Sequence, residues 1–199
     1  MALRRHNATR LDRHDWIHAG VEILSSKGMD AVRVEALARQ LSISKGSFYW
    51  HFKDRSDLLE AILEEWETRQ SDWNTEGESV SNPVERWARL FELFAQAAYA
   101  RLEMAISSWA RVDEKVALRV ANADRKRIAY LSRVFQEIGF TANQAAEWAN
   151  AAMFLYLGWM DRMTRTATHE PSEPALAELL SRFVLAASAL ASQEALQSR

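Results

Sequence analysis

Residues 36–55 read ALARQLSISKGSFYWHFKDR, a pattern that predicts two short helices joined by a tight turn. Leu37 and Leu41 recur at helical spacing, so the first helix has an apolar face to bury. The next three residues interrupt this spacing, and the hydroxyl of the last of them, Ser44, is suited to cap the second helix. The residues expected to pack the two helices together are Ile43, Phe48 and Phe52. The segment therefore predicts a helix-turn-helix.

Polar and aromatic side chains of the second helix are expected to face outward. They are Lys45, Ser47, Tyr49, Trp50 and His51. In a helix-turn-helix the second helix enters the major groove of DNA, where donors and rings of this kind meet phosphates and base edges. The pattern therefore indicates contact with duplex DNA.

The stretch SKGSFYWHFK at 44–53, followed by Asp57-Leu58-Leu59, resembles the DNA-binding signature of TetR-family (TetR/AcrR-like) transcriptional regulators. The resemblance runs from Trp16 to Leu63, and the rest of the chain is similar to the family only in length and helical pattern. It implies an all-α protein with an N-terminal helix-turn-helix domain and a larger helical domain for ligand binding and dimerisation. It also implies three partners, namely double-stranded operator DNA, a second copy of the chain and an apolar or aromatic small-molecule effector.

Two positions depart from the family pattern. Ser42 stands where the family usually has Gly, at a turn that tends to require positive φ, and a non-Gly residue there costs roughly 1 kcal/mol. Arg33 stands where a Ser or Thr usually caps the first helix of the motif, although Glu35 in the first turn partly compensates through the helix dipole. Because of these two departures, the sequence does not define where the first helix of the motif begins and ends.

The candidate DNA-binding residues differ in chemistry. Lys is a point cation and Tyr and His are neutral donors, so four residues are assigned to phosphate by chemistry and by family position. They are Lys45, Tyr49, His51 and Lys53. Ser47 and Trp50 are assigned to base edges, because an indole covers a thymine methyl and a hydroxyl pairs with several edges. Gly46 lets the helix N-terminus approach DNA closely, so that backbone amides bind phosphate. Arg33 and Ser44 complete the candidate set.

Charge is distributed unevenly along the chain. Residues 1–55 contain ten Lys and Arg against six Asp and Glu, whereas residues 56–199 contain fifteen against twenty-one. The basic N-terminal segment is suited to contact with phosphate, whereas the acidic remainder of the chain is not. Random scatter of surface charge is the alternative, and the coincidence of charge and motif in the same residues favours the first interpretation.

The composition excludes several classes of protein. The chain has no Cys, so a disulfide framework, a thiolate zinc site and a cysteine nucleophile are unavailable. No segment resembles a signal peptide or an uncharged membrane span, so we expect a cytoplasmic protein without a membrane partner.

The rest of the chain predicts about nine helices in total and no strand. Asp12 is expected to cap a first helix that ends at Lys27-Gly28. After the motif, the expected helices cover residues 54–73, 83–100, 102–111, 113–138, 142–165 and 174–196, with loops at 76–82 and 166–173. The predicted domains are a DNA-binding domain at 1–55 and an effector-binding and dimerisation domain at 56–199.

Six of the eight Trp residues lie beyond residue 55. The resemblance implies that they line a cavity for an effector, whereas packing in a core is the commoner use of Trp. The preferred lining residues are Trp66, Phe94, Met104, Trp109, Tyr130 and Phe154. The last two helices carry alanine-rich apolar faces. In the family such a pair builds a two-fold dimer, and closure of the monomer core is the alternative.

No set of residues matches a catalytic, cofactor-binding or metal-binding pattern. His14 and His18 are spaced i, i+4, but no Glu or Cys completes a familiar metal site. The sequence therefore predicts a ligand-responsive regulator, a repressor that binds a palindromic operator as a homodimer and is released by an effector, and not an enzyme. Two alternatives remain, a DNA-binding protein whose second domain binds another protein, and a helical enzyme that borrowed the DNA-binding domain.

Overall fold

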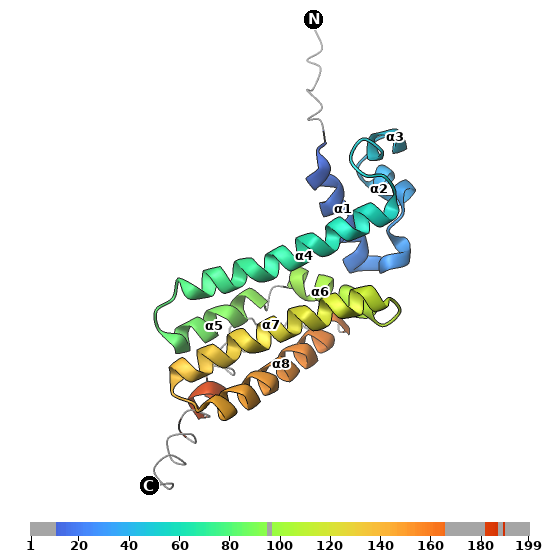
Figure 1. Cartoon of the computed structure of the whole chain (residues 1–199). Helices are drawn as coiled ribbons and strands as arrows, with labels where there is room; N and C mark the ends of the chain where they lie inside the picture. Colours follow the sequence, from blue (N-terminus) through green and yellow to red (C-terminus); the bar gives the residue numbers. More distant parts are fainter. Residues whose placement is uncertain (1–10, 95–96, 166–181, 187–188, 190–199) are drawn as a thin grey trace, which may run out of the picture. The chain divides into compact units, whose positions relative to one another are not determined.

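The computed structural model describes residues 11–94, 97–165, 182–186 and 189, and the regular secondary structure of these residues is entirely helical (Figure 1). The chain divides into two compact units, which we call the head unit (Met1–Glu65) and the body unit (Trp66–Arg199). Helix α4 (Arg55–Glu78) continues from the head unit into the body unit. The domain boundary predicted after residue 55 stays a prediction.

The head unit contains α1 (Arg13–Lys27), the 3-10 turn η1 (Met29–Ala31), α2 (Val34–Gln40), α3 (Lys45–Phe48) and the first part of α4. The predicted cap of the first helix is confirmed. The Asp12 carboxylate accepts hydrogen bonds from the backbone amides of His14 and Asp15, and the Asp15 side chain accepts one from the amide of Asp12. This reciprocal capping satisfies amides that would otherwise lack partners at the start of α1. Gly28, at φ 81°, closes the helix after Lys27 as expected.

The core of the head unit is aromatic and aliphatic. Its most buried side chains are Trp16, Leu24, Val32, Leu37, Phe48, Phe52, Leu58 and Ile62. The Phe48 ring meets Trp16 edge-on and stacks on Phe52, with centroids 5.3 and 5.4 Å apart. Gly20 permits the close approach of α1 to α4, because a Cβ atom there would lie 2.7 Å from Ile62 Cδ1. This core fixes the two helices of the motif against α1 and α4.

The body unit contains the rest of α4, α5 (Pro83–Phe94), α6 (Ala97–Ala110), α7 (Glu114–Ile138) and α8 (Ala142–Arg165). Helix α7 packs against α5, α6 and α8. Its predicted bounds are confirmed, because the Asp113 carboxylate accepts from two amides of the first turn and Gly139 ends the helix at φ 113°. None of the described helices combines the length and the apolar character needed to cross a bilayer.

Several predicted helix bounds in this unit are wrong. Helix α4 extends to Glu78 instead of ending at Trp73, and the loop predicted at 76–82 is correspondingly shorter. Helix α6 begins at Ala97, not at residue 102. Polar residues and a single Gly weaken a helix by only about 1 kcal/mol, so they do not end one that continues to pack. Most of the helix predicted at 174–196 lies outside the described residues, of which 182–186 and 189 are helical.

Ser42, in the turn between α2 and α3, has a φ of 57°, in the left-handed region. This conformation was expected because the family usually has Gly at this position. We expect Ser42→Gly to stabilise the protein by about 0.5–1 kcal/mol, because Gly adopts this conformation without a steric cost. Gly28→Ala is the matched control in the same unit and should destabilise it, since Gly28 also has positive φ. Urea unfolding of both variants measures the two effects. A loss of stability in Ser42→Gly would contradict the expectation.

Candidate nucleic-acid interface

Helix α3 has only four residues and depends on its neighbours for its position. The amide of Ile43 donates to the carbonyl of Ala38 over 2.9 Å, which holds the turn against α2. Phe48 is fully buried and anchors the end of α3 in the core of the head unit. The residues on the opposite side of this short segment are therefore presented to solvent.

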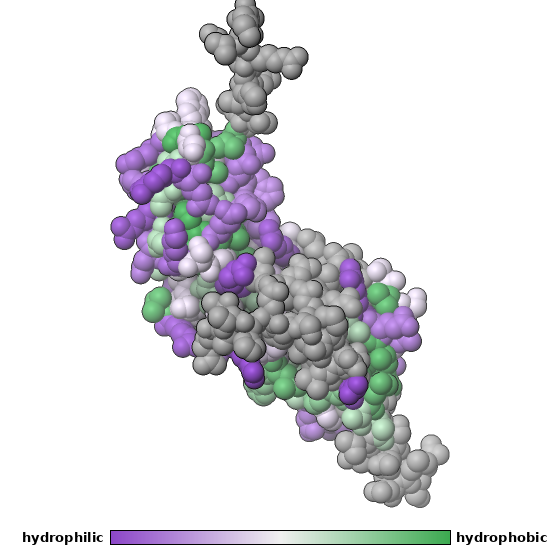
Figure 2. Space-filling view, turned by 180° about the vertical axis from the view of Figure 1, so that it is seen from behind, coloured by the Kyte–Doolittle hydropathy of each residue, from purple (hydrophilic) through white to green (hydrophobic). Residues whose placement is uncertain are grey.

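Two aromatic side chains dominate this presented surface. Tyr49 is 61% exposed and Trp50 is 83% exposed, directly after the buried Phe48. The Tyr49 ring meets Phe48 edge-on at 5.3 Å, so its orientation is fixed by the core. The exposed indole of Trp50, just after the C-terminal end of α3, is largely unpacked in the head unit and is available to a partner. Figure 2 shows a face of the head unit on which hydrophilic residues predominate, with hydrophobic ones between them.

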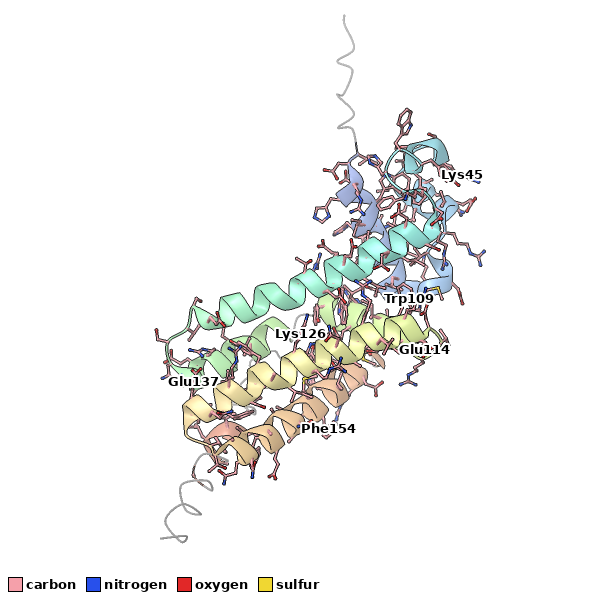
Figure 3. All side chains as sticks on the ribbon, in the orientation of Figure 1. Lys45, Trp109, Glu114, Lys126, Glu137 and Phe154 are labelled. Carbon is pink, nitrogen blue, oxygen red and sulfur yellow. The ribbon has the colours of Figure 1, made fainter. Side chains whose placement is uncertain are left out.

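Two exposed lysines, Lys45 and Lys53, lie in the same segment as these rings. Figure 3 labels Lys45 on the head unit. Its Nζ lies 2.8 Å from Glu35 Oε1, and both side chains are exposed. The hydrogen bond from Lys45 holds the pKa of the Glu35 carboxyl below its usual value. The backbone amide of Lys53 donates to Asp57 Oδ2 over 2.9 Å, which fixes the approach to α4 and leaves the Lys53 side chain exposed. Exposed cations and exposed aromatic rings thus occur together on this segment, a combination that suits contact with the phosphates and bases of duplex DNA.

The predicted DNA-binding residues are all present on or beside α3, except Arg33, which precedes α2. The exposed members are Arg33, Ser44, Lys45, Gly46, Tyr49, Trp50 and Lys53, and the half-buried members are Ser47 and His51. One detail is wrong, because Ser44 occupies the cap position of α3 without a hydrogen bond from its side chain to the helix. Their contacts with DNA stay predictions.

Arg55 is a positioning residue that the sequence did not reveal. Its guanidinium donates to the carbonyl of Val32 over 2.5 Å and to that of Met29 over 2.6 Å. These bonds fasten the start of α4 to the segment before α2. The partners lie 23 and 26 residues away in sequence, so spacing alone gives no signal for them.

The sequence model of the family described as "Bacterial regulatory proteins, tetR family" matches residues 17–62, which contain this whole interface. Residues 17–62 are TetR/AcrR-like. Tetracycline repressor protein class G from Vibrio anguillarum is 39% identical over 56 residues, which are 28% of this chain and 27% of that protein. The match thus spans little more than a quarter of that relative, and it places a TetR-family DNA-binding domain in the head unit.

Solved structures resemble this TetR-like chain along most of its length. A transcriptional regulator from Rhodococcus sp. Rha1 superimposes with a TM-score of 0.71 at 16% identity, covering 92% of this chain and 97% of the other. The regulator FadR from Bacillus subtilis, in complex with stearoyl-CoA, does so with a TM-score of 0.62 at 15% identity, covering 87% and 97%. At these identities the likeness shows that the body unit shares the helical fold of such regulators.

The core of the body unit contains a buried ionic network centred on Glu103. Its carboxylate accepts two hydrogen bonds from Arg127, at 2.8 and 2.9 Å, and one from the indole of Trp66 at 2.7 Å. The hydroxyl of Tyr99 also donates to Glu103, and Arg127 donates to Asp124 over 3.0 Å. The network joins α4, α6 and α7, and none of its charged members was singled out from the sequence.

Burial alone would raise the pKa of Glu103, but the Arg127 charge and the donated hydrogen bonds hold it below its usual value. Burial raises the pKa of the Tyr99 hydroxyl, and the neighbouring carboxylate of Glu103 raises it further. Glu103 is thus ionised and Tyr99 neutral at neutral pH. The indole of Trp66, which was expected to line an effector cavity, donates a hydrogen bond to this carboxylate, and its place in a cavity stays a prediction.

The other candidate effector residues lie on several helices, and their grouping around one cavity stays a prediction. Trp109 on α6 and Tyr130 on α7 are both buried in the body unit. Met104 is half-buried next to Glu103. The Phe154 side chain is 72% exposed on α8, so it does not line the interior of the body unit. The side chain of Phe94 lies outside the described residues.

Proposed function

We propose that this chain is a ligand-responsive transcriptional repressor that binds a palindromic operator as a homodimer and is released by a small-molecule effector. The observation that carries the proposal is the exposed pair Tyr49 and Trp50, held by the buried Phe48 within a TetR-family DNA-binding domain. Trp50 meets base edges, while the exposed cations meet phosphate. The protein acts in the cytoplasm, where its operator is found.

A single copy of α3 reads too few base pairs for specific binding, which favours a dimer. Two copies of α3 must lie roughly 34–36 Å apart, or a multiple of that distance, to enter successive major grooves. The outer face of α8 offers an apolar surface for pairing, because Phe154 is 72% exposed and Leu155 is 46% exposed. A Cβ atom added to Gly158, on the same helix, would meet no other atom within 4 Å, so a second helix can approach there.

Helix α4 provides a path for regulation because it belongs to both units. An effector bound in the body unit shifts the second half of α4 and thereby changes the spacing of the two α3 helices. A coupling free energy of about 1–3 kcal/mol would lower operator affinity about 5–150-fold. The likeness to FadR, whose structure contains stearoyl-CoA, supports a fold able to hold such a ligand.

Selection of bound fragments from random duplex DNA tests the proposal. We expect enrichment of a palindrome, and light scattering of the purified chain should give the mass of a dimer. A monomer that enriches no sequence even in dilute salt would reject the proposal. A protein that enriches a palindrome but shows no thermal shift with any member of an effector library would support instead a body unit that binds a protein partner.

Lys53→Ala should weaken binding to every duplex to the same extent, because Lys53 is assigned to phosphate and carries no sequence information. The slope of log affinity against log salt concentration should fall by about 1. Lys27→Ala is the matched control, since Lys27 lies in the last turn of α1 and is not among the candidate residues. Fluorescence anisotropy with the selected operator and with an unrelated duplex measures both effects. Equal slopes for Lys53→Ala and the wild type would contradict the assignment.

A further inference from the structure

The head unit pairs one of its candidate DNA-binding cations with an acidic residue of the same unit. Lys45 is the first residue of α3 and Glu35 is the second residue of α2. Their charged atoms lie 2.8 Å apart, and the two side chains are 59% and 55% exposed (Figure 3). The pair therefore lies on the surface, where DNA can reach it.

The carboxylate of Glu35 occupies the position that a phosphate oxygen would take on Lys45. The hydrogen bond from Lys45 lowers the pKa of Glu35, so the carboxyl is ionised at neutral pH. A phosphate can reach the ammonium in two ways. Either Lys45 leaves Glu35, which costs the ion pair, or the phosphate settles beside the carboxylate, which adds repulsion between like charges.

We propose that Glu35 lowers the affinity of the head unit for duplex DNA by competing with backbone phosphate for Lys45. The inference rests on the proposed function and assigns Glu35 a role in tuning it. Its effect is independent of DNA sequence, because phosphate contacts carry no sequence information. The residue thereby limits attachment of the protein to arbitrary DNA.

A double-mutant cycle isolates this effect. We would measure the affinity of wild type, Glu35→Gln, Lys45→Gln and the double variant for a random-sequence duplex, by fluorescence anisotropy over a series of salt concentrations. Glu35→Gln should bind about two- to fivefold more tightly, the range that an exposed ion pair can supply. The salt slope should become steeper by about 0.9, equivalent to one more phosphate neutralised. When Lys45 is already replaced by Gln, Glu35→Gln should raise the affinity for the duplex no more than the control variant described next does.

The control is Asp30→Asn, which makes the same change of charge at an exposed residue of η1 in the same unit. Glu35 also lies in the first turn of α2, where a negative charge favours the helix. A purely structural role would change the melting temperature without changing the salt slope, so circular dichroism is recorded for each variant.

Two results would overturn the inference while leaving the proposed function intact. One is a gain in DNA affinity for Glu35→Gln that is no larger than the gain for Asp30→Asn. The other is a gain in DNA affinity that stays the same when Lys45 is replaced by Gln. If neither the wild type nor Glu35→Gln binds any duplex in dilute salt, both the inference and the proposed function fail.

Discussion

Arg127→Met is expected to lower the free energy of unfolding by about 3–5 kcal/mol, because it leaves a buried carboxylate without its counter-ion. Arg127 is 7% exposed and Glu103 is 1% exposed, so water cannot replace the lost partner. The guanidinium donates to both oxygens of Glu103, and this bidentate geometry is the strongest arrangement available to an ion pair. Urea unfolding of the wild type and the variant measures the difference.

A double variant separates the cost of an unpaired charge from the value of the pair. Replacing a whole buried ion pair by apolar residues is often neutral or stabilising. Glu103→Leu combined with Arg127→Met should therefore recover part of the stability that Arg127→Met loses, because the charge is balanced again while the indole of Trp66 and the hydroxyl of Tyr99 lose their acceptor. If the double variant recovered no stability, the hydrogen bonds to Glu103 would outweigh charge balance.

A second Arg–Glu pair, between Arg119 on α7 and Glu67 on α4, serves as the control. Arg119 donates two hydrogen bonds to Glu67, from Nε at 2.8 Å and from Nη2 at 2.7 Å, so this pair is also bidentate. These side chains are 22% and 38% exposed, and solvent screening reduces what the pair contributes. Arg119→Met should cost less than about 1 kcal/mol. If Arg119→Met lowered the free energy of unfolding as much as Arg127→Met does, burial of the ion pair would not explain the large effect of Arg127→Met.

The pH dependence of stability provides an independent check on Glu103. Its pKa in the folded protein is depressed, so its contribution is present above the unfolded pKa, about 4.3, and is lost as pH falls through the folded pKa. The wild type should therefore lose stability below about pH 4 more steeply than the double variant, which lacks this carboxyl. If the free energy of unfolding fell with pH in the same way for both proteins, the ionised state of Glu103 would be contradicted.

The sequence predicted the head unit well because its signals are local. The Asp12 cap and the buried Phe48 each follow from a residue type and its immediate neighbours, whereas the left-handed conformation of Ser42 was expected from the family resemblance. The buried faces of α1 and α4 follow from spacing alone, as Trp16 and Ile62 show. The family signature then adds the function that these elements serve.

The body unit was less predictable because its central feature depends on contacts between distant residues. Glu103 and Arg127 are 24 residues apart, and each lies on the buried face of its own helix. A charged residue three or four positions from buried apolar ones, as Glu103 is from Tyr99 and Ile106, is the signal available in the sequence. That signal indicates a buried charge but does not identify its partner.

Phe154 illustrates the limit of composition as a guide. An aromatic residue in an Ala- and Met-rich helix was expected to line the interior, yet its side chain is 72% exposed. Helical periodicity accounts for this placement, because the neighbouring buried residues Ala152 and Tyr156 define the opposite face of α8. The aromatic character of Phe154 therefore contributes to a surface, and the proposed dimer is the occupant that the fold favours.

Phe48→Ala is expected to destabilise the head unit by about 3–5 kcal/mol, through lost burial and the cavity that remains. Phe48 is fully buried and its ring meets both Trp16 and Phe52. A helix of four residues cannot persist once its anchor is removed, so operator binding should be lost together with the fold of α3. Urea unfolding followed by circular dichroism measures the first effect, and anisotropy with labelled operator measures the second.

Trp50→Ala is the matched control, because it removes a larger aromatic residue only two positions along the chain. The Trp50 side chain is 83% exposed, so the unfolding free energy should stay within about 0.5 kcal/mol of the wild type. Operator affinity should nevertheless fall about 5- to 150-fold, the range expected for a lost base contact. Stability and recognition would then depend on different aromatic residues of one short segment. If Trp50→Ala were instead to lose stability while retaining full affinity, the indole would belong to the core and α3 would need another residue to read the bases.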